Sequence, residues 1–323
     1  MGDATLALIV AAGAAVATAA QLPVFISRLQ LAGVYDVPNA RSSHSRVVVR
    51  GGGIAMVLPA LVGASVIGGS IGLRALIVMA LLGLAVTGFL DDLRGLDIKP
   101  RFLAQLIAGI LAAYAITGVG LLLLPAGLLI LATVNAFNFM DGINGLSGAT
   151  LVVSGVAYGL YGLEASSTTL AVIGFLAAGL GIGFLPFNFP NARVFLGDAG
   201  SYLGGGLLGI SAVIAMDAGI QSLAALAPIA IYGADTMTTL IRRSLRGEKV
   251  GEAHREHTYQ RLAQIVGHSI STLATAGLTA LLVAISVFRQ VLGGTLPQVV
   301  LSLVVLALYL LLPGLAQRSK AAS

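Results

Sequence analysis

The sequence predicts an all-α fold: a polytopic bundle of about eleven membrane-spanning helices. Three observations lead to this expectation. The mean hydropathy of the 323-residue chain is +0.98, 57% of its residues are hydrophobic and only 10% are charged. Long apolar runs such as ATLALIVAAGAAVATAAQLPVFI suit a helix that needs about 20 residues to cross a bilayer. Strong β-alternation is absent, so helices are the expected way to satisfy backbone hydrogen bonds in lipid.

The apolar runs define the expected helices in order. The spans are residues 4–27, 51–70, 72–90, 101–117, 118–135, 147–163, 168–186, 200–216, 221–241, 270–288 and 295–315. No repeat, linker or low-complexity segment divides them. The chain is therefore expected to form one integral membrane domain over residues 1–323.

The distribution of charge predicts the orientation of these helices. With eleven spans, one side carries the tail and the segments 28–50, 91–100, 136–146, 187–199 and 242–269. Of the 18 Lys and Arg residues, only Arg74 and Arg289 fall on the other side. The positive-inside bias makes the first side cytoplasmic, with the N-terminus outside and the C-terminus inside. Every His and Asn also falls on that side. The positive-inside bias does not require this distribution of His and Asn, whereas a polar reaction centre at that surface would explain it.

Composition excludes several classes of function. The absence of cysteine removes disulfides and thiolate metal sites. No basic segment precedes the first apolar run, so a cleaved signal peptide is not expected. The pI of about 9.7 is typical of nucleic-acid-binding proteins, but the cations here are distributed for topology, and no nucleic-acid partner is expected.

The stretch FLDDLRGLDIKPRFLAQ places two adjacent carboxylates at a membrane boundary. Asp91 and Asp92 follow directly on one span, and Lys99 and Arg101 open the next. Neighbouring carboxylates repel each other unless they share a cation. Mg²⁺ prefers oxygen ligands and is often held by one or two carboxylates with substrate phosphates. A solvated loop with topogenic cations is the alternative.

The stretch NAFNFMDGINGL concentrates amide and carboxylate groups in an apolar chain. Asn135, Asn138 and Asp141 recur every three residues and would share a helix face, which Asn144 extends past a break at Gly142. Such a row can bind sugar hydroxyls or a base edge. Capping and turn formation are the alternative, but they account for one or two of these residues rather than four.

Two further segments carry candidate phosphate contacts. In FLPFNFPNARVFLGDAGSYLGGG, Asp198 precedes a glycine-rich helix start that favours anions, although a simple N-cap is the alternative. The triplet Gly204–Gly206 is consistent with close helix packing. In YDVPNARSSHSRVVVRGGG, His44 and Arg50 are either phosphate contacts or orientation signals. The final glycines lack the ending of a P-loop and are read as a turn.

The longest loop, RRSLRGEKVGEAHREHTYQRL, combines histidines with cations. His254 and His257 are three residues apart, with Arg255 between them. A pair at this spacing without a third ligand is a weak zinc signal, whereas the cations suit a diphosphate. Attraction to anionic lipid head groups is the alternative.

Taken together, these segments resemble the polytopic polyprenyl-phosphate N-acetylhexosamine-1-phosphate transferases, which include the phospho-N-acetylmuramoyl-pentapeptide transferases. The matching blocks are DVPNARSSHSRVVVRGGG, FLDDLRGLDIKPRFLAQ, NAFNFMDGINGL, FNFPNARVFLGDAGS and the His-x-x-His of AHREHTYQRL, in family order over residues 36–261. The resemblance implies transfer of a sugar-1-phosphate from a UDP-N-acetylhexosamine to undecaprenyl phosphate with release of UMP. It also implies the bacterial cytoplasmic membrane, an active site facing the cytoplasm, and Mg²⁺, with Mn²⁺ as an alternative.

Carried over by position, the resemblance also implies roles for single residues. Asp198 and Asp92 would hold the metal, and Asp91, Asp92, His254 and His257 would be catalytic. The substrates would contact His44, Arg50, Lys99, Arg101, Asn138, Asp141, Asn144, Asn188, Phe195 and Arg255. Phe195 would stack on the uracil base, and the histidine loop would close over the nucleotide diphosphate.

Two departures from the muramoyl-pentapeptide branch argue against the peptidoglycan enzyme. Arg94 stands where that branch usually has Lys, and its triple histidine is replaced by His-Arg-Glu-His. The sequence looks more like the branch that starts O-antigen or similar surface polysaccharides, with N-acetylfucosamine, N-acetylquinovosamine or N-acetylglucosamine as the sugar. A homodimer remains open. A secondary transporter or channel, acting through an intramembrane carboxylate such as Asp235, is the alternative from another class.

Overall fold

The protein folds into a bundle of long helices. The computed structural model describes residues 2–38, 46–249, 251 and 254–322. These residues form α1 (Asp3–Leu31), β1 (Tyr35–Asp36), β2 (Val48–Val49), α2 (Ile54–Ser65), α3 (Ile71–Arg94), α4 (Ile98–Thr117), α5 (Leu123–Met140), α6 (Leu146–Glu164), α7 (Thr168–Asn188), α8 (Gly197–Asp217), α9 (Ser222–Leu226), the 3-10 helix η1 (Ala227–Ile229), α10 (Ala230–Leu245), α11 (Thr258–Val266), α12 (His268–Val287) and α13 (Thr295–Ala322). The predicted all-α class is confirmed.

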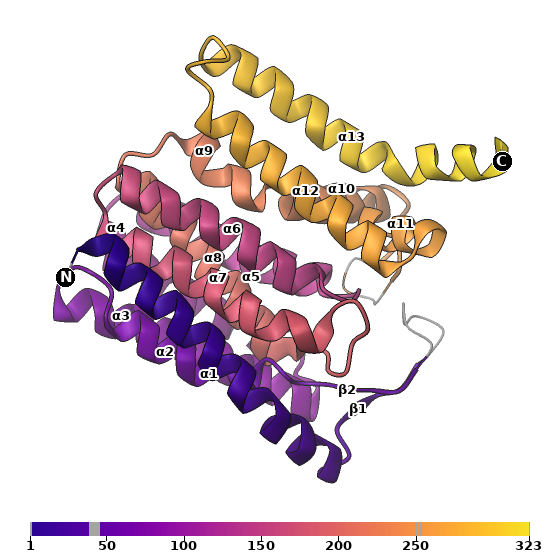
Figure 1. Ribbon diagram of the computed structural model, residues 1–323, viewed down its shortest axis with the longest axis horizontal. Helices are drawn as coiled ribbons and strands as arrows, with labels where there is room; N and C mark the ends of the chain where they lie inside the picture. Colours follow the sequence, from indigo (N-terminus) through magenta and orange to yellow (C-terminus); the bar gives the residue numbers. More distant parts are fainter. Residues whose placement is uncertain (1, 39–45, 250, 252–253, 323) are drawn as a thin grey trace.

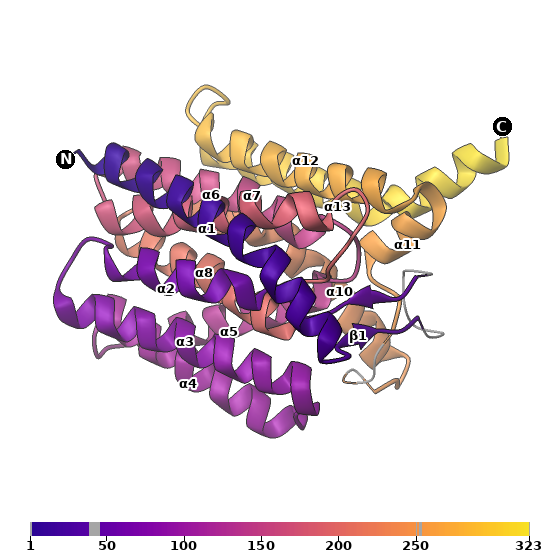
Figure 2. The same cartoon turned by 60° about the horizontal axis from the view of Figure 1, so that its bottom comes forward.

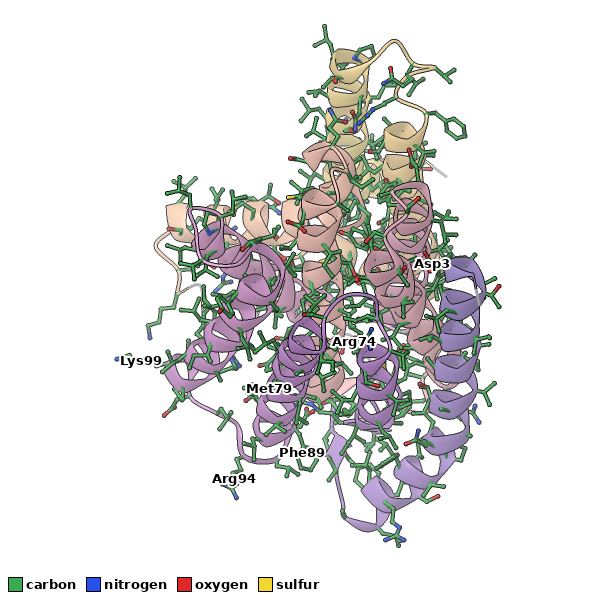
Figure 3. All side chains as sticks on the ribbon, turned by 90° about the vertical axis from the view of Figure 1, so that its left-hand side faces the viewer. Asp3, Arg74, Met79, Phe89, Arg94 and Lys99 are labelled. Carbon is green, nitrogen blue, oxygen red and sulfur yellow. The ribbon has the colours of Figure 1, made fainter. Side chains whose placement is uncertain are left out.

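The long helices lie side by side, and the two termini lie at opposite ends of the bundle (Figure 1). The strands and α11 gather at the end that carries the C-terminus, and the rotated view in Figure 2 agrees. Within the described residues, ten helical segments are long and apolar enough to cross a membrane. Apolar side chains cover their outer surfaces (Figure 3), as expected for helices that contact lipid tails. The chain is therefore a multi-pass membrane protein.

Helix α8 forms the centre of the bundle. In the most apolar 18-residue stretch of α8, 94% is buried inside the protein, whereas only 17% of the corresponding stretch is buried in α1 and in α13. Helices α3, α5 and α7 pack against α8. The glycines predicted to allow close packing do so: a Cβ on Gly205 would lie 2.6 Å from the Cα of Val134 in α5. Small residues let helix backbones approach closely where the hydrophobic effect does not drive association.

Several expected spans differ from the observed helices. The span expected over residues 72–90 extends to Arg94, so Asp91 and Asp92 lie in a helix and not in a loop. The span expected over residues 51–70 contains a helix of only 12 residues, α2, flanked by turns. Its start is fixed by Gly53, which lies so close to Gly200 that any Cβ would overlap it. The span expected over 118–135 begins later and extends to Met140. The span expected over 221–241 is interrupted at η1, where Pro228 lacks a backbone donor.

The segments predicted to share one side of the membrane do meet at one end of the bundle, hereafter the polar end. Segment 28–50 contacts segment 187–199 through the hydrogen bond that the backbone N–H of Phe195 donates to the Val49 carbonyl, and segment 136–146 contacts it through Gly145 and Asn188. Segment 242–269 contacts 136–146 through Tyr259, whose hydroxyl donates to the Phe139 carbonyl at the end of α5. The side of the membrane that the polar end faces stays a prediction.

Candidate active site

Three aspartates from two distant segments converge at the polar end. Asp91 and Asp92 lie on the last turn of α3, and Asp198 lies on the first turn of α8. Gly88 explains how the two helices come together, because any Cβ on it would overlap the backbone carbonyl of Asp198. A glycine one turn before the aspartate pair thus allows α3 to touch the start of α8.

Asp92 interacts with the beginning of α8. Its Oδ2 accepts a hydrogen bond from the backbone N–H of Ala199 at 3.0 Å, and its Oδ1 lies 3.0 Å from Nε of Arg50. The Asp92 side chain is only 5% exposed. The unpaired N–H groups and the dipole at a helix start favour a negative group, so the start of α8 holds this carboxylate in place.

Asp198 is held from two sides. Its Oδ1 accepts a hydrogen bond from Nδ2 of Asn138 at 2.7 Å, and its Oδ2 accepts one from Nη2 of Arg50 at 2.8 Å. A single guanidinium therefore bridges Asp92 and Asp198. Although burial acts to lower the pKa of Arg50, the carboxylates of Asp198 and Asp92 raise it above its ordinary value, so Arg50 stays charged.

Both carboxylate oxygens of Asp91 accept hydrogen bonds. Its Oδ1 accepts from the backbone N–H of Leu96 at 2.8 Å. Its Oδ2 accepts from Arg101 at 3.1 Å and from the hydroxyl of Tyr202 at 2.6 Å. Sequence reasoning overlooked Tyr202, although it lies four residues after Asp198 and therefore on the same face of α8. Arg101, which was predicted to contact a substrate, pairs with Asp91. Lys99 is exposed and projects away from the helices, as Arg94 does (Figure 3).

The carboxylates fit a hard divalent cation. Asp92 and Asp198 supply oxygen ligands, which Mg²⁺ and Mn²⁺ prefer, and the Arg50 guanidinium already lies where one positive group contacts both. Among the residues that the structure describes, no group of three or more His, Asp or Glu side chains could hold a metal. Mg²⁺ does not require such a cage, because it is commonly held by one or two carboxylates together with substrate phosphates.

The asparagine-rich stretch divides between the site and the helix interior. Asn138 points to Asp198 and also donates to the hydroxyl of Ser201 at 2.9 Å. Asn135 is buried and donates to Oε1 of Gln105 in α4 at 2.8 Å. The two asparagines that were expected to share a helix face therefore have different partners: Asn138 contacts Asp198, and Asn135 joins α5 to α4.

Asp141 follows directly on α5 and is half-buried. Its carboxylate accepts a hydrogen bond from Ser147 at 2.5 Å. Burial raises the pKa of Asp141 from 3.8 to about 7, and the nearby Asp198 adds to this rise, while the Ser147 hydrogen bond and Arg50 oppose it. The carboxyl is thus partly protonated near neutral pH.

Asn144 and Asn188 connect the loops at the polar end. Asn188 is buried; its Oδ1 accepts from the backbone N–H of Gly145 at 2.6 Å and its Nδ2 donates to the Val194 carbonyl at 2.8 Å. The Asn144 side chain donates to the Pro190 carbonyl at 2.9 Å. These bonds hold segment 136–146 against segment 187–199. Phe195, half-buried in the latter, is fixed by backbone bonds to the β2 region.

The histidine loop forms an aromatic stack above the end of α5. The ring centroid of His257 lies 5.0 Å from that of His254 and 6.1 Å from that of Phe139. Burial, together with nearby His257 and Arg243, lowers the pKa of His254 to about 4, so its ring is neutral at pH 7.

Two nitrogen atoms of this loop lack a hydrogen-bond partner. Within the described part of the chain, His254 Nδ1 and Arg255 Nε are buried without a hydrogen-bond partner. Buried polar groups are normally satisfied, so such atoms mark a place where a bound group is expected. His44, the other histidine predicted for the site, lies outside the described residues.

Comparison with known proteins points to one family. A model of glycosyl transferase family 4 matches residues 74–216, which include all three aspartates and Asn138. The chain is 30% identical to a decaprenyl-phosphate N-acetylglucosaminephosphotransferase of Mycolicibacterium smegmatis, over 73% of this chain and 70% of that protein. It is 27% identical to a probable undecaprenyl-phosphate N-acetylglucosaminyl 1-phosphate transferase of Bacillus subtilis, over 75% of this chain and 73% of that protein.

A more distant relative shares a shorter region. A phospho-N-acetylmuramoyl-pentapeptide-transferase of Desulforapulum autotrophicum is 30% identical over 42% of this chain and 50% of that protein. The similarity to the mycobacterial protein extends over more than two thirds of its length. Together with the converging aspartates, this similarity confirms the resemblance noted in the sequence: the chain belongs to glycosyl transferase family 4.

Proposed function

We propose that this protein transfers N-acetylhexosamine-1-phosphate from a UDP-sugar to a polyprenyl phosphate, forming a lipid-diphosphate sugar and releasing UMP. The observation that carries the proposal is the contact of Arg50 with both Asp92 and Asp198 at the polar end. Two relatives are named as polyprenyl-phosphate sugar-phosphate transferases, which supports the same reaction. The acceptor is undecaprenyl phosphate, as in the name of the Bacillus relative.

The site must bring three phosphate groups together against their mutual repulsion. A divalent cation, Mg²⁺ with Mn²⁺ as a substitute, held by Asp92 and Asp198, would supply positive charge to the developing oxyanions. Arg50 and Arg101, which contact the aspartates, add fixed positive charge next to it. Pre-organised charge of this kind is commonly a large contribution to phosphoryl-transfer catalysis.

The two adjacent aspartates differ in their surroundings, which supports different roles. Both oxygens of Asp91 already accept hydrogen bonds, so this carboxylate is suited to fixing Arg101 and the end of α3. Asp92 contacts Arg50 and the start of α8, beside Asp198. We assign to Asp92 the contact with the metal and the reacting phosphates, and to Asp91 the maintenance of their geometry.

The nucleotide-sugar would bind between segments 136–146, 187–199 and 242–269. Asp141, Asn144, Asn188 and Phe195 form or support the wall of this region through the contacts described above. The buried unpaired atoms of His254 and Arg255 are suited to hydrogen bonds with a diphosphate. His257 supports His254 through ring stacking.

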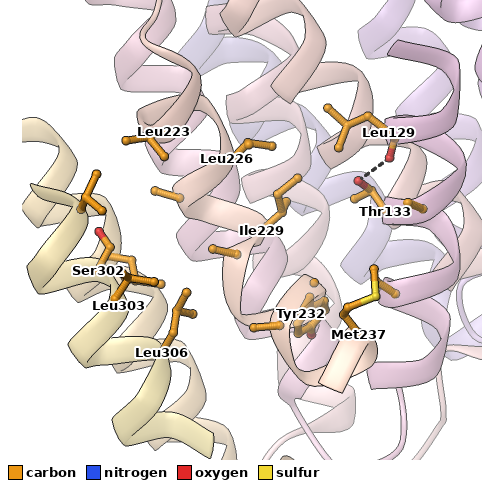
Figure 4. A pocket seen from close by; sticks show the side chains of 18 residues that line it. Leu129, Thr133, Leu223, Leu226, Ile229, Tyr232, Met237, Ser302, Leu303 and Leu306 are labelled. Carbon is orange, nitrogen blue, oxygen red and sulfur yellow. Dashed lines mark hydrogen bonds between the residues drawn. The ribbon is translucent and has the colours of Figure 1, made fainter. Parts of the chain in front are cut away.

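An apolar cavity is suited to the lipid tail of the acceptor. A cavity of about 510 Å³ lies between α5, the α9–α10 segment and α13, lined by residues such as Leu129, Leu226, Met237 and Leu306 (Figure 4). Its lining residue Ala136 lies on α5 two residues before Asn138, which contacts Asp198. Ala136 and Asn138 face different sides of α5, but both lie in its last two turns, so an isoprenoid chain in this cavity would have its phosphate at the polar end.

The sugar is an N-acetylhexosamine, with N-acetylglucosamine, N-acetylfucosamine and N-acetylquinovosamine as the set to test. The departures at Arg94 and the histidine loop favour initiation of an O-antigen or similar surface polysaccharide. This reaction fits the bacterial cytoplasmic membrane, with the polar end facing the cytoplasm, where the charge bias would put it.

The transporter alternative depends on Asp235, an ionisable residue inside an apolar span. Asp235 is 0% exposed and accepts five hydrogen bonds from neighbouring groups, which supports a fixed structural carboxylate rather than an ion-binding group on a transport path. Flux into proteoliposomes that depends on Asp235 but not on Asp198 would favour transport.

The direct test of the proposal uses purified protein, a polyprenyl phosphate, Mg²⁺ and each UDP-N-acetylhexosamine in turn, with UMP release as the measurement. Asp198→Asn is expected to lower the rate by about 10²- to 10³-fold. Asp97→Asn is the matched control, because Asp97 is exposed and its side chain makes no capping bond. Absence of UMP with every sugar, from protein that remains folded, would contradict the proposal.

A further inference from the structure

The carboxylate of Asp235 accepts hydrogen bonds from five groups where α10 meets the histidine loop. It lies in α10 and is 0% exposed. Five donors surround it: Thr239 Oγ1 at 3.2 Å, His257 Nδ1 at 3.2 Å, Thr258 N at 2.9 Å, Tyr259 N at 3.2 Å and Tyr309 Oη at 2.7 Å. Burial of a carboxylate is costly unless it is paired and hydrogen-bonded, and here both oxygens are fully used.

Two of these donors are the free backbone N–H groups of α11. A helix leaves its first N–H groups without partners, and a Ser, Thr, Asp or Asn at the N-cap usually satisfies them. The N-cap of α11 is His257, and Asp235 of α10 takes over this task for Thr258 and Tyr259. The orientation of α11 therefore depends on a carboxylate from another helix.

The same carboxylate fixes the ring of His257. An ionised carboxylate only accepts hydrogen bonds, so Nδ1 of His257 carries the hydrogen in this contact and the tautomer is set. His257 in turn stacks on His254, whose Nδ1 is buried and unpaired among the described residues. Asp235 thus acts on the ligand-facing end of the loop through His257.

Tyr309 ties this arrangement to the last helix. It is 0% exposed, lies in α13 and donates its hydroxyl to Asp235 Oδ2, 74 residues away in sequence. Tyr309 is not among the residues that line the apolar cavity proposed for the lipid tail, although Leu306, one turn earlier, is. A change at Tyr309 is therefore expected to act on the histidine loop through Asp235.

We propose that Asp235, supported by Tyr309, is a positioning residue that holds His257 and the start of α11 in the arrangement that binds the nucleotide diphosphate. This inference rests on the proposed function for the identity of the ligand. It predicts a selective effect on the nucleotide-sugar, because the contacts of Asp235 described above lead to the histidine loop and not to Asp92 or Asp198.

The first test compares KM for the UDP-sugar and for the polyprenyl phosphate. Loss of a hydrogen bond to a charged group costs about 1.5–3 kcal/mol, so Asp235→Asn is expected to raise KM for the UDP-sugar at least about tenfold. KM for the acceptor should stay within about twofold. Tyr309→Phe, the milder variant if Asp235→Asn fails to fold, should raise KM for the UDP-sugar about threefold. Equal losses for both substrates would overturn the proposal.

A matched tyrosine and a double-mutant cycle separate positioning from general destabilisation. Tyr161 is also buried, but its hydroxyl has no hydrogen-bond partner within the described residues, so Tyr161→Phe should leave both KM values unchanged. In a His257→Ala background, Tyr309→Phe should add little further effect, because its route to the ligand is already removed. Fully additive effects would show that Tyr309 acts by another route and would overturn the proposal.

Hydrogen exchange gives a readout that does not depend on activity. Asp235→Asn is expected to speed amide exchange in the peptide that contains Thr258 and Tyr259, relative to wild type and to Tyr161→Phe. If the wild type releases no UMP while this exchange still rises, the proposed function fails and the positioning of α11 by Asp235 stands. Unchanged exchange together with an unchanged KM would overturn the positioning inference and leave the proposed function intact.

Discussion

The guanidinium of Arg50 lies 2.8 Å from the carboxylate of Asp198, a residue 148 positions further along the chain. The same guanidinium lies 3.0 Å from Asp92, so one cation joins α3, α8 and the segment that enters α2. One guanidinium and two carboxylates that are far apart in sequence thus lie together. A divalent cation and phosphates would interact with this same set of charges.

The close approach of α3 and α8 at Gly88 is expected to be essential for this location. Gly88→Ala adds a Cβ that overlaps the Asp198 carbonyl, so we expect the helices to separate and UMP release to fall at least about tenfold, because small misplacement of reacting groups is costly. Gly83→Ala is the matched control on the same helix, since no atom lies within 4 Å of its added Cβ. Equal activity of the two variants would contradict this account of the packing.

Magnesium is expected to stabilise the folded protein before any substrate is added. A ligand at a hundredfold excess over its Kd contributes about 2.7 kcal/mol of stability, so Mg²⁺ should raise the Tm of wild type. The increase should be much smaller in Asp92→Asn and Asp198→Asn. Thermal unfolding with Mg²⁺ and with EDTA measures this. The same increase in wild type and in both variants would place the ion elsewhere.

The hydroxyl of Tyr202 is expected to contribute to stability through Asp91. Tyr202→Phe removes a 2.6 Å hydrogen bond and leaves a buried carboxylate with one donor fewer, which costs about 1–3 kcal/mol. We therefore expect a lower Tm, with a smaller change for Tyr161→Phe, whose hydroxyl is unpaired in the described structure. A Tm of Tyr202→Phe equal to that of wild type would show that the bond contributes nothing.

Asp141 is expected to make stability depend on pH. Burial raises its pKa from 3.8 to about 7, so between these values the folded protein binds a proton that the unfolded chain has lost. Stability therefore falls as pH rises through this window and levels off above about pH 7. Asp141→Asn lacks this loss, so its Tm relative to wild type should be higher at pH 8 than at pH 5. A difference in Tm that stays constant across these pH values would contradict the assignment.

The sequence predicted the parts of the site that stand out against an apolar background. Asp91, Asp92 and Asp198 are among the few charged residues of the chain, and their positions at helix ends predicted a shared location. The structure confirms that they meet. The start of α2 also followed from its glycines, although the helix is shorter than expected because turns flank it on both sides.

Other parts of the site depend on contacts that no local pattern encodes. Tyr202 and Tyr309 look like ordinary apolar residues of membrane helices, and their partners Asp91 and Asp235 lie 111 and 74 residues away. Asn188 stood out as a polar residue near the site, but both ends of its amide are used to join two loops. Spacing along the chain does not tell a ligand contact from such an internal bond.

The most direct test of the central claim follows the two phosphorus atoms of the donor. Transfer of a sugar-1-phosphate breaks the bond between the α- and β-phosphates, so the β-phosphorus should leave with the sugar and the α-phosphorus should leave as UMP. With a UDP-N-acetylhexosamine labelled in the β-phosphate, purified protein and Mg²⁺ should move the label into the polyprenyl fraction, and Asp198→Asn should not. Label that stays in water-soluble UDP while the sugar reaches the lipid would contradict phosphoryl transfer at this site.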